Sequence, residues 1–72
     1  MKILIFRTDI KTKKKFKAVK PVFNRHPSIS SWSIDIEDID NVLRIEATEN
    51  LHESDVIALT NTQGFYCEAL KD

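Results

Sequence analysis

The alternation of hydrophobic and polar residues along the chain predicts four β-strands. Residues 3–6 are a short run of β-branched, leucine and aromatic side chains without a helical period, which is typical of a buried strand. Hydrophobic and polar residues alternate over residues 32–36, 42–47 and 65–70, as in strands that keep one face in water. Residues 38–41 have the composition of a turn, so we expect the two central strands to form a hairpin.

Two other segments have the spacing of three to four positions that places hydrophobic residues on one side of an α-helix. The first helix is expected over residues 13–25, with Thr12 able to cap its start. Its hydrophobic stripe consists of Phe16, Val19, Val22 and Phe23. Pro21 lies inside this segment and removes one backbone hydrogen bond, so we expect a kink or an early loosening there.

The second helix is expected to be short. Asn50 and Glu53 have the spacing of a capping box before its start. Val56 and Leu59 continue a hydrophobic face, and Gly64 lies where a helix end favours glycine. The order βαββαβ predicts an α+β, ferredoxin-like fold, in which two helices cover one face of a four-stranded antiparallel sheet.

The length and composition are those of a single domain over residues 1–72. Hydrophobic residues make up 42% and charged residues 31%, a balance that argues against disorder. Eleven basic residues balance eleven acidic ones, so we expect no general attraction to nucleic acid or to a membrane. The run at residues 3–6 is too short for a signal peptide or a membrane span. A single cysteine, Cys67, fits a reducing compartment, and we therefore expect a cytoplasmic protein.

Several families share this order of elements, so the residues at the candidate sites must separate them. An RNA-recognition domain needs aromatic residues on the open sheet face, where the third strand has Val42, Arg44 and Glu46. A small-molecule regulatory domain of the amino-acid-binding type usually relies on a glycine in its first loop. The only glycine here is Gly64, and this interpretation stays the weaker alternative. No nucleophile, base and oxyanion grouping and no phosphate-binding glycine loop is present, so we expect no catalysis.

The segment from Phe6 to Phe16 resembles the first loop of heavy-metal-associated, copper-chaperone-like domains. Those domains carry a large hydrophobic residue, one spacer and then C-x-x-C. Ile10 stands at the hydrophobic position, while Thr12 and Lys15 stand where the two cysteines would be. The resemblance extends over most of the chain, through Val19, Phe23, residues 31–35, residues 42–46, Gly64 and Phe65. It implies the ferredoxin-like fold and a family role in binding and passing on copper or similar ions.

The two replaced positions change what this loop can bind. Two soft thiolates hold copper(I), whereas a threonine hydroxyl is hard and neutral, and a lysine ammonium repels a metal ion. We therefore expect a degenerate family member without metal or cofactor, which serves as a non-catalytic protein-interaction or anion-docking module. A weak or altered metal carrier of the copper-chaperone type is the alternative.

Lysines crowd the expected start of the first helix. Lys13, Lys14 and Lys15 would lie at the positive end of the helix dipole, where a cation costs some tenths of a kcal/mol, up to about 1. With Lys11 and Thr12 they form a candidate surface for an acidic protein or a small anion. The alternative is that these lysines are simply solvated. A polarised molecule is predicted because Lys17 and Lys20 extend the basic run, while Asp35, Glu37, Asp38 and Asp40 crowd a second segment.

Four further residues have competing interpretations. His26 follows the first helix and His52 begins the second, so both are expected at the end of the domain far from the replaced cysteines. Two histidines without a third ligand form a poor metal site, and we expect ordinary helix-end residues. Cys67 is expected to be a buried, inert thiol on the core side of the last strand. Trp32, in phase with the following isoleucines, is expected to anchor the core rather than to be an exposed recognition ring.

Overall fold

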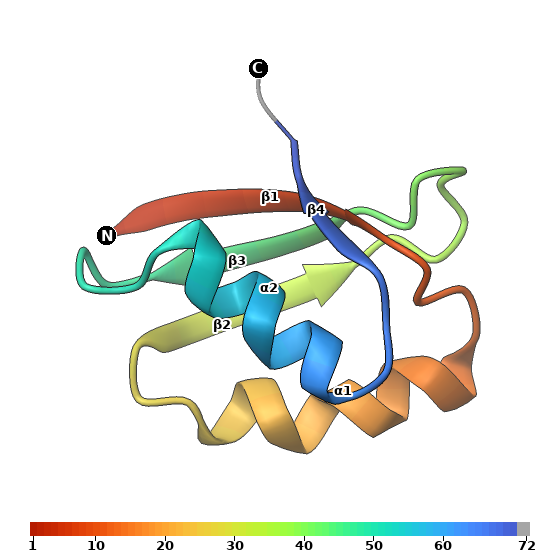
Figure 1. Ribbon diagram of the computed structural model, residues 1–72, viewed down its shortest axis with the longest axis horizontal. Helices are drawn as coiled ribbons and strands as arrows, with labels where there is room; N and C mark the ends of the chain where they lie inside the picture. The colour runs from red at the N-terminus through yellow and green to blue at the C-terminus, as the bar shows by residue number, and fades with distance from the viewer. Residues whose placement is uncertain (71–72) are drawn as a thin grey trace.

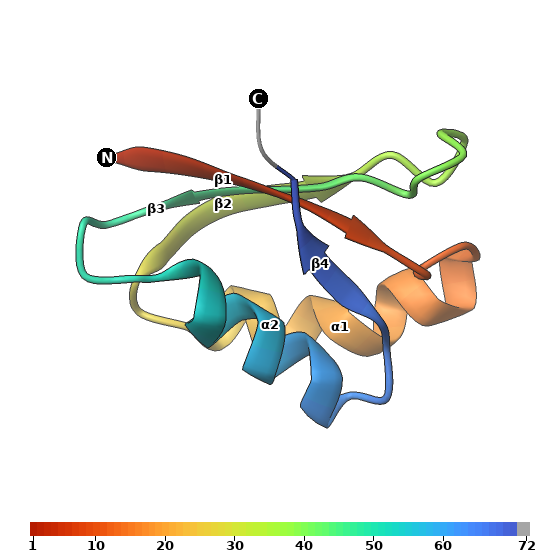
Figure 2. The same ribbon diagram turned by 45° about the horizontal axis from the view of Figure 1, so that its top comes forward.

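The structure, a computed structural model, describes residues 1–70, in which one four-stranded sheet carries two helices against the same face (Figure 1, Figure 2). In chain order the elements are β1 (Lys2–Thr8), α1 (Lys13–Arg25), β2 (Ile29–Ile34), β3 (Leu43–Ala47), α2 (Glu53–Thr62) and β4 (Cys67–Ala69). This arrangement confirms the expected α+β, ferredoxin-like βαββαβ fold. Within residues 1–70, no helix has the length and hydrophobicity needed to cross a membrane.

The strands lie in the order β2-β3-β1-β4, and every neighbouring pair is antiparallel. Successive side chains of a strand point to opposite faces, so Leu43, Ile45 and Ala47 are buried under the helices while Arg44 is exposed on the open face. Phe6 near the end of β1 pairs with Leu43 at the start of β3. The loop after β1 and the loop before β3 therefore lie at the same end of the molecule, as both views show (Figure 1, Figure 2).

The core fills the space between the sheet and the helices. Its fully buried hydrophobic residues are Phe6, Ile10, Val19, Phe23, Leu43, Ile45, Ala47 and Val56. Trp32 is half-buried, and its ring centroid lies 5.0 Å from those of both Phe16 and Phe23. The indole N–H donates to Oδ1 of Asn24 at 2.8 Å. Trp32 thus packs against the core with its polar edge satisfied, as the sequence predicts.

Helix α1 has the bounds that the sequence predicts, and Thr12 is its N-cap. The helix continues through Pro21 to Arg25, so it does not end early at the proline. Val19 and Phe23, which lie on either side of Pro21 in the sequence, are completely buried. Their packing holds the helix across the missing hydrogen bond, because tertiary contacts supply most of a helix's stability in a protein.

The predicted strand bounds differ from the observed ones: β1 extends beyond residues 3–6, β3 starts one residue later than predicted, and the largest differences are in β2 and β4. β2 starts at Ile29 and ends at Ile34, earlier than the predicted segment 32–36. It stops there because Oδ1 of Asp35 accepts the backbone N–H groups of Glu37 at 3.1 Å and Asp38 at 3.2 Å, which folds the chain into a turn. β4 contains only Cys67–Ala69 of the six residues that alternate.

The predicted capping box of α2 is also wrong. The N-cap is His52 instead of Asn50, and its backbone N–H donates to Oδ2 of Asp55 at 2.9 Å. Leu51 is buried against the core, which fixes the residues before the helix and moves its start two positions along the chain. Gly64, beyond the other end of α2, has a φ of 86°, the left-handed conformation expected there.

Candidate functional site

The segment that joins β1 to α1 is held tightly to the rest of the domain. The Thr8 hydroxyl donates to the backbone oxygen of Asn41 at 2.7 Å and accepts the N–H of Ile10 at 3.2 Å. Ile10 is completely buried. Oδ1 of Asp9 accepts the backbone N–H of Tyr66 at 2.8 Å, which ties the segment to the chain before β4. Residues 8–10, which precede the candidate surface, are therefore held in place from two sides, by the loop before β3 and by the chain before β4.

Thr12 and Lys15, the positions where the resemblance places cysteines, are neighbours at the start of α1. Oγ1 of Thr12 accepts the backbone N–H of Lys15 at 3.2 Å, and the Thr12 carbonyl accepts the N–H of Phe16 at 2.9 Å. The first bond satisfies one of the free N–H groups at the helix start, and the second is the first regular backbone bond of the helix. The threonine hydroxyl thus caps the helix. The Lys15 side chain carries a positive charge at a position where a cysteine thiolate would carry a negative one.

The candidate surface of Lys11, Thr12, Lys13, Lys14 and Lys15 is exposed, apart from the half-buried Lys15. The first turn of α1 contains no acidic residue. None of the ion pairs found within residues 1–70 involves a lysine of this surface. The positive charges of the side chains and the helix dipole therefore add up here.

The chain's one thiol lies away from this surface, inside the domain. Cys67 is buried on the core side of β4, as the sequence predicts. Burial raises the pKa of the Cys67 thiol, and a hydrogen bond with Thr60 opposes that shift in part. Across residues 1–70, no three histidine, cysteine or acidic side chains come together in a way that could hold a metal ion. The donors present at residues 12 and 15 do not fit copper(I), which prefers thiolates.

The two histidines lie at helix ends. His26 is the residue after α1, and its Nδ1 accepts the backbone N–H of Ser28 at 3.1 Å. His52 is the N-cap residue of α2. The end of α1 and the start of α2 lie on the side of the domain opposite to the β1–α1 loop, as expected (Figure 1). His26 thus has a structural partner at a helix end, in accord with the sequence-based interpretation.

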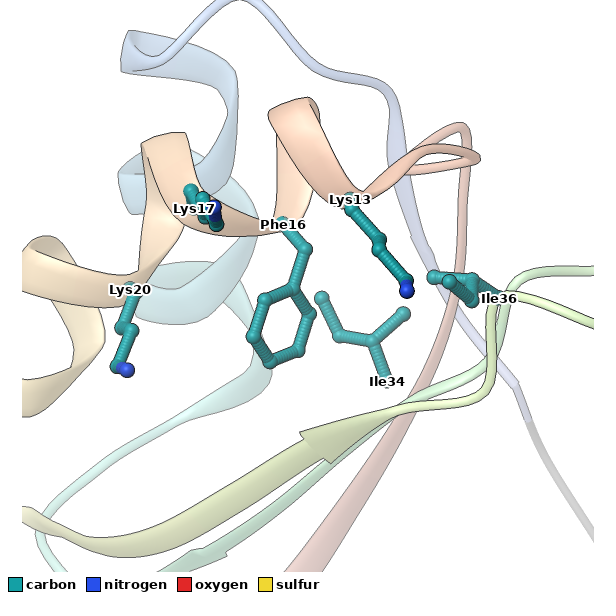
Figure 3. Close-up of a pocket in the computed structure, with 6 residues that line it drawn as sticks. All are labelled: Lys13, Phe16, Lys17, Lys20, Ile34 and Ile36. Atoms are coloured by element: carbon teal, nitrogen blue, oxygen red, sulfur yellow. The ribbon is translucent and has the colours of Figure 1, made fainter.

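A groove between α1 and the β2 edge was not predicted from the sequence. It has a volume of about 330 Å³ and is lined by Lys13, Phe16, Lys17, Lys20, Ile34 and Ile36 (Figure 3). The three hydrophobic side chains form its floor, and the lysines stand around it. A signal for the basic side existed, because Lys13, Lys17 and Lys20 have helical spacing and share a face with Phe16. The other two hydrophobic residues, Ile34 and Ile36, come from β2 and the following loop, which only the tertiary structure brings to α1.

The acidic segment lies beside the basic one rather than across the molecule. The backbone N–H of Thr8 donates to the oxygen of Asp40 at 3.1 Å, so the β2–β3 loop touches the end of β1. Asp40 also pairs with Arg7 at 2.8 Å. The predicted charge polarity is therefore confined to one end of the domain, where a basic helix start and an acidic loop are neighbours (Figure 2).

No protein-family model matches the sequence, and no curated protein does either. Solved structures do match it along almost the whole chain. The yeast copper transporter domain Ccc2a aligns at 12% identity with a TM-score of 0.84, covering 100% of this chain and 99% of that one. A structure of the Atx1–Cu(I)–Ccc2a complex aligns at 12% identity with a TM-score of 0.85 and the same coverage. The copper(I)-loaded first domain of the human copper chaperone for SOD1 aligns at 16% identity with a TM-score of 0.79, covering 93% of this chain and 89% of that one. The chain therefore shares the ferredoxin-like fold of these copper-transporter and copper-chaperone domains.

Proposed function

We propose that this chain is a non-catalytic docking domain of the cytoplasm that binds an acidic protein surface through Lys11, Thr12, Lys13, Lys14 and Lys15. The observation that carries the proposal is the unpaired positive charge on a rigid helix start. Lys13, Lys14 and Lys15 occupy the first turn of α1, which lacks an acidic residue, and the segment before it is fixed by buried hydrogen bonds. An acidic partner would supply the missing negative charge at that helix end.

The comparison with the Atx1–Cu(I)–Ccc2a complex supports a docking role, since a domain of this fold there meets a protein partner. The chemistry of the site argues against copper as the cargo of this chain. The Thr12 hydroxyl caps the helix, the Lys15 ammonium repels a cation, and the Cys67 thiol is buried. Docking is thus the part of the chaperone role that these residues can still perform.

A copper(I) competition titration tests the loss of metal binding. The natural chain should not compete with a moderate chelator, while Thr12→Cys combined with Lys15→Cys should bind one ion because two thiolates then flank the helix start. Each form is also measured with Cys67→Ala, which removes any contribution of the buried thiol. Tight one-to-one binding by the natural chain would instead support the alternative, a weak or altered metal carrier.

A pull-down from the native lysate tests the docking surface. The variant K13Q/K14Q/K15Q should lose acidic partners that the natural chain retains, and raised salt should weaken the natural interaction. The matched control K2Q/R25Q/R44Q removes the same number of positive charges from exposed or half-buried positions outside the surface. Equal retention of partners by the natural chain and K13Q/K14Q/K15Q would contradict the proposal and leave the lysines as solvated residues.

A further inference from the structure

The groove between α1 and β2 combines a hydrophobic floor with a basic rim. Phe16, Ile34 and Ile36 are half-buried, and they lie beneath exposed Lys13, Lys17 and Lys20 (Figure 3). No ion pair within the described part of the chain involves these three lysines. The floor favours a hydrophobic side chain, and the rim favours neighbouring carboxylates, so the groove suits an acidic segment with one exposed hydrophobic residue.

The β2–β3 loop of the chain itself has this composition. Ile39 at its tip is 94% exposed, the most exposed of the large hydrophobic residues in residues 1–70. Asp38 precedes it directly and Glu37 lies one residue further back; both are exposed and take part in none of the ion pairs within that range. Asp40 also follows Ile39 directly, although it already pairs with Arg7.

The loop is held in one shape before it meets anything. The side-chain amide of Asn41, which is buried, donates to the backbone oxygens of Ile36 at 3.2 Å and Asp38 at 3.1 Å. Oδ1 of Asp38 accepts the backbone N–H of Asp40 at 2.8 Å. Docking therefore costs the loop little conformational entropy, so a small contact area is enough for weak binding.

We infer that the groove receives the β2–β3 loop of a second copy of this chain, with Ile39 on the hydrophobic floor and Glu37 and Asp38 facing the lysines. Ile36 belongs to both the groove and the start of the loop, so the groove and the loop lie side by side at one end of the domain. Two copies related by a twofold axis can therefore each place their loop in the groove of the other, so that every contact is made twice. The expected assembly is a closed, weakly associating dimer.

Other exposed hydrophobic residues do not fit the groove as well. Met1, Ile3 and Tyr66 are 77%, 48% and 51% exposed, and none of them has acidic residues on both sides in the sequence. The groove shares Lys13 with the docking surface of residues 11–15, whereas Lys17 and Lys20 lie outside that surface, so K17E/K20E tests the groove and leaves the docking surface unchanged. Loss of one can be measured without loss of the other.

Sedimentation equilibrium of the natural chain between about 10 µM and about 1 mM, a range that covers weak association free energies, tests the dimer. The average mass should rise from 8.3 kDa toward twice that value, and added salt should lower it. Ile39→Asp and K17E/K20E should each shift the dissociation constant upward at least tenfold. A chain that carries K17E/K20E together with E37K, which keeps the Asp38 bond that shapes the loop, should recover part of the association, since opposite charges face each other again.

Ile3→Asp is the matched control, because it replaces another exposed isoleucine on a different face and should leave the dimer intact. Amide NMR shifts that change with concentration should map to the loop and the groove, and the same spectra show whether each variant is folded. A natural chain that stays monomeric throughout would overturn the inference, as would a dimer that Ile39→Asp leaves unchanged. A monomer whose groove shifts respond instead to an added acidic peptide would overturn the second copy as the occupant in favour of a peptide.

Discussion

Replacing Lys13, Lys14 and Lys15 together by glutamine is expected to stabilise the free domain, although no hydrophobic contact is added. These lysines are the first three residues of α1, and its first turn has no acidic residue. The helix dipole places a positive partial charge at this end, so each ammonium group raises the free energy of the folded state. Glutamine keeps most of the side-chain length and a comparable helix propensity while it removes the charge.

The size of the gain follows from the exposure of the three side chains. Lys13 and Lys14 are exposed and Lys15 is half-buried, so solvent screening places each near the low end of the dipole range, about 0.3 kcal/mol. For all three residues the free energy of unfolding should increase by about 1 kcal/mol. In a domain of this size, that gain corresponds to a rise of roughly 4–8 °C in Tm.

Urea unfolding and thermal melting of both forms measure this gain, first at low salt and then at about 1 M salt. The gain should shrink at high salt, where the Debye length falls to about 3 Å. Lys11→Gln is the control, because it removes the same charge just before the N-cap residue and should change stability little. A triple variant that is less stable than the natural chain, or whose gain persists at high salt, would refute the dipole argument.

Three further predictions concern the residues around the site. Thr12→Ala should lower the free energy of unfolding by about 1 kcal/mol, since the cap to Lys15 is lost, and Thr12→Ser should restore most of it in urea unfolding. Ile10→Ala should cost about 2–5 kcal/mol, because Ile10 is completely buried, and a melt with little or no change would show that the loop is not part of the core. Burial raises the pKa of Cys67, so the folded state keeps the thiol proton where the unfolded chain loses it. The stability from this group is complete below the ordinary thiol value of 9.0 and is lost as pH rises through the folded-state pKa; the difference in unfolding free energy between the natural chain and Cys67→Ala should follow that course.

The sequence patterns that are set by local periodicity predict the structure well. The spacing of Phe16, Val19 and Phe23 fixes α1, and its bounds agree with the structure even across Pro21. Alternation also identifies β3 and the buried side of β4, including Cys67. Each of these elements buries one face, and the spacing of hydrophobic residues predicts which face that is.

Element ends follow from side-chain hydrogen bonds, which the pattern does not contain. The alternation continues through Ile36, but the Asp35 carboxylate folds the chain into a turn one residue after β2. The spacing of Asn50 and Glu53 fits a capping box equally well as that of His52 and Asp55, and the buried Leu51 selects the second pair. Periodicity alone cannot rank such competing local bonds.

The candidate site was predicted only in part for a related reason. Lys11 to Lys15 are adjacent in sequence, so their shared surface is visible without a structure. The groove is not, because Ile34 and Ile36 reach Lys17 and Lys20 only after the sheet has packed against α1. The closeness of the basic and acidic segments likewise depends on the pairing of β1 with β3.

Thr8 couples the local unfolding of the basic β1–α1 segment to that of the acidic β2–β3 loop. Its hydroxyl bonds both Asn41 and Ile10, and its backbone N–H bonds Asp40, so neither loop can detach without breaking bonds of the same residue. Segments joined in this way exchange their amide protons as one cooperative unit. The N–H groups of Thr8 and Ile10 should therefore show similar protection from hydrogen exchange, and Thr8→Val, which removes the two hydroxyl bonds but keeps the backbone bond to Asp40, should lower that protection. A partner that stiffens one loop will thereby slow the opening of the other, although it touches only one of them.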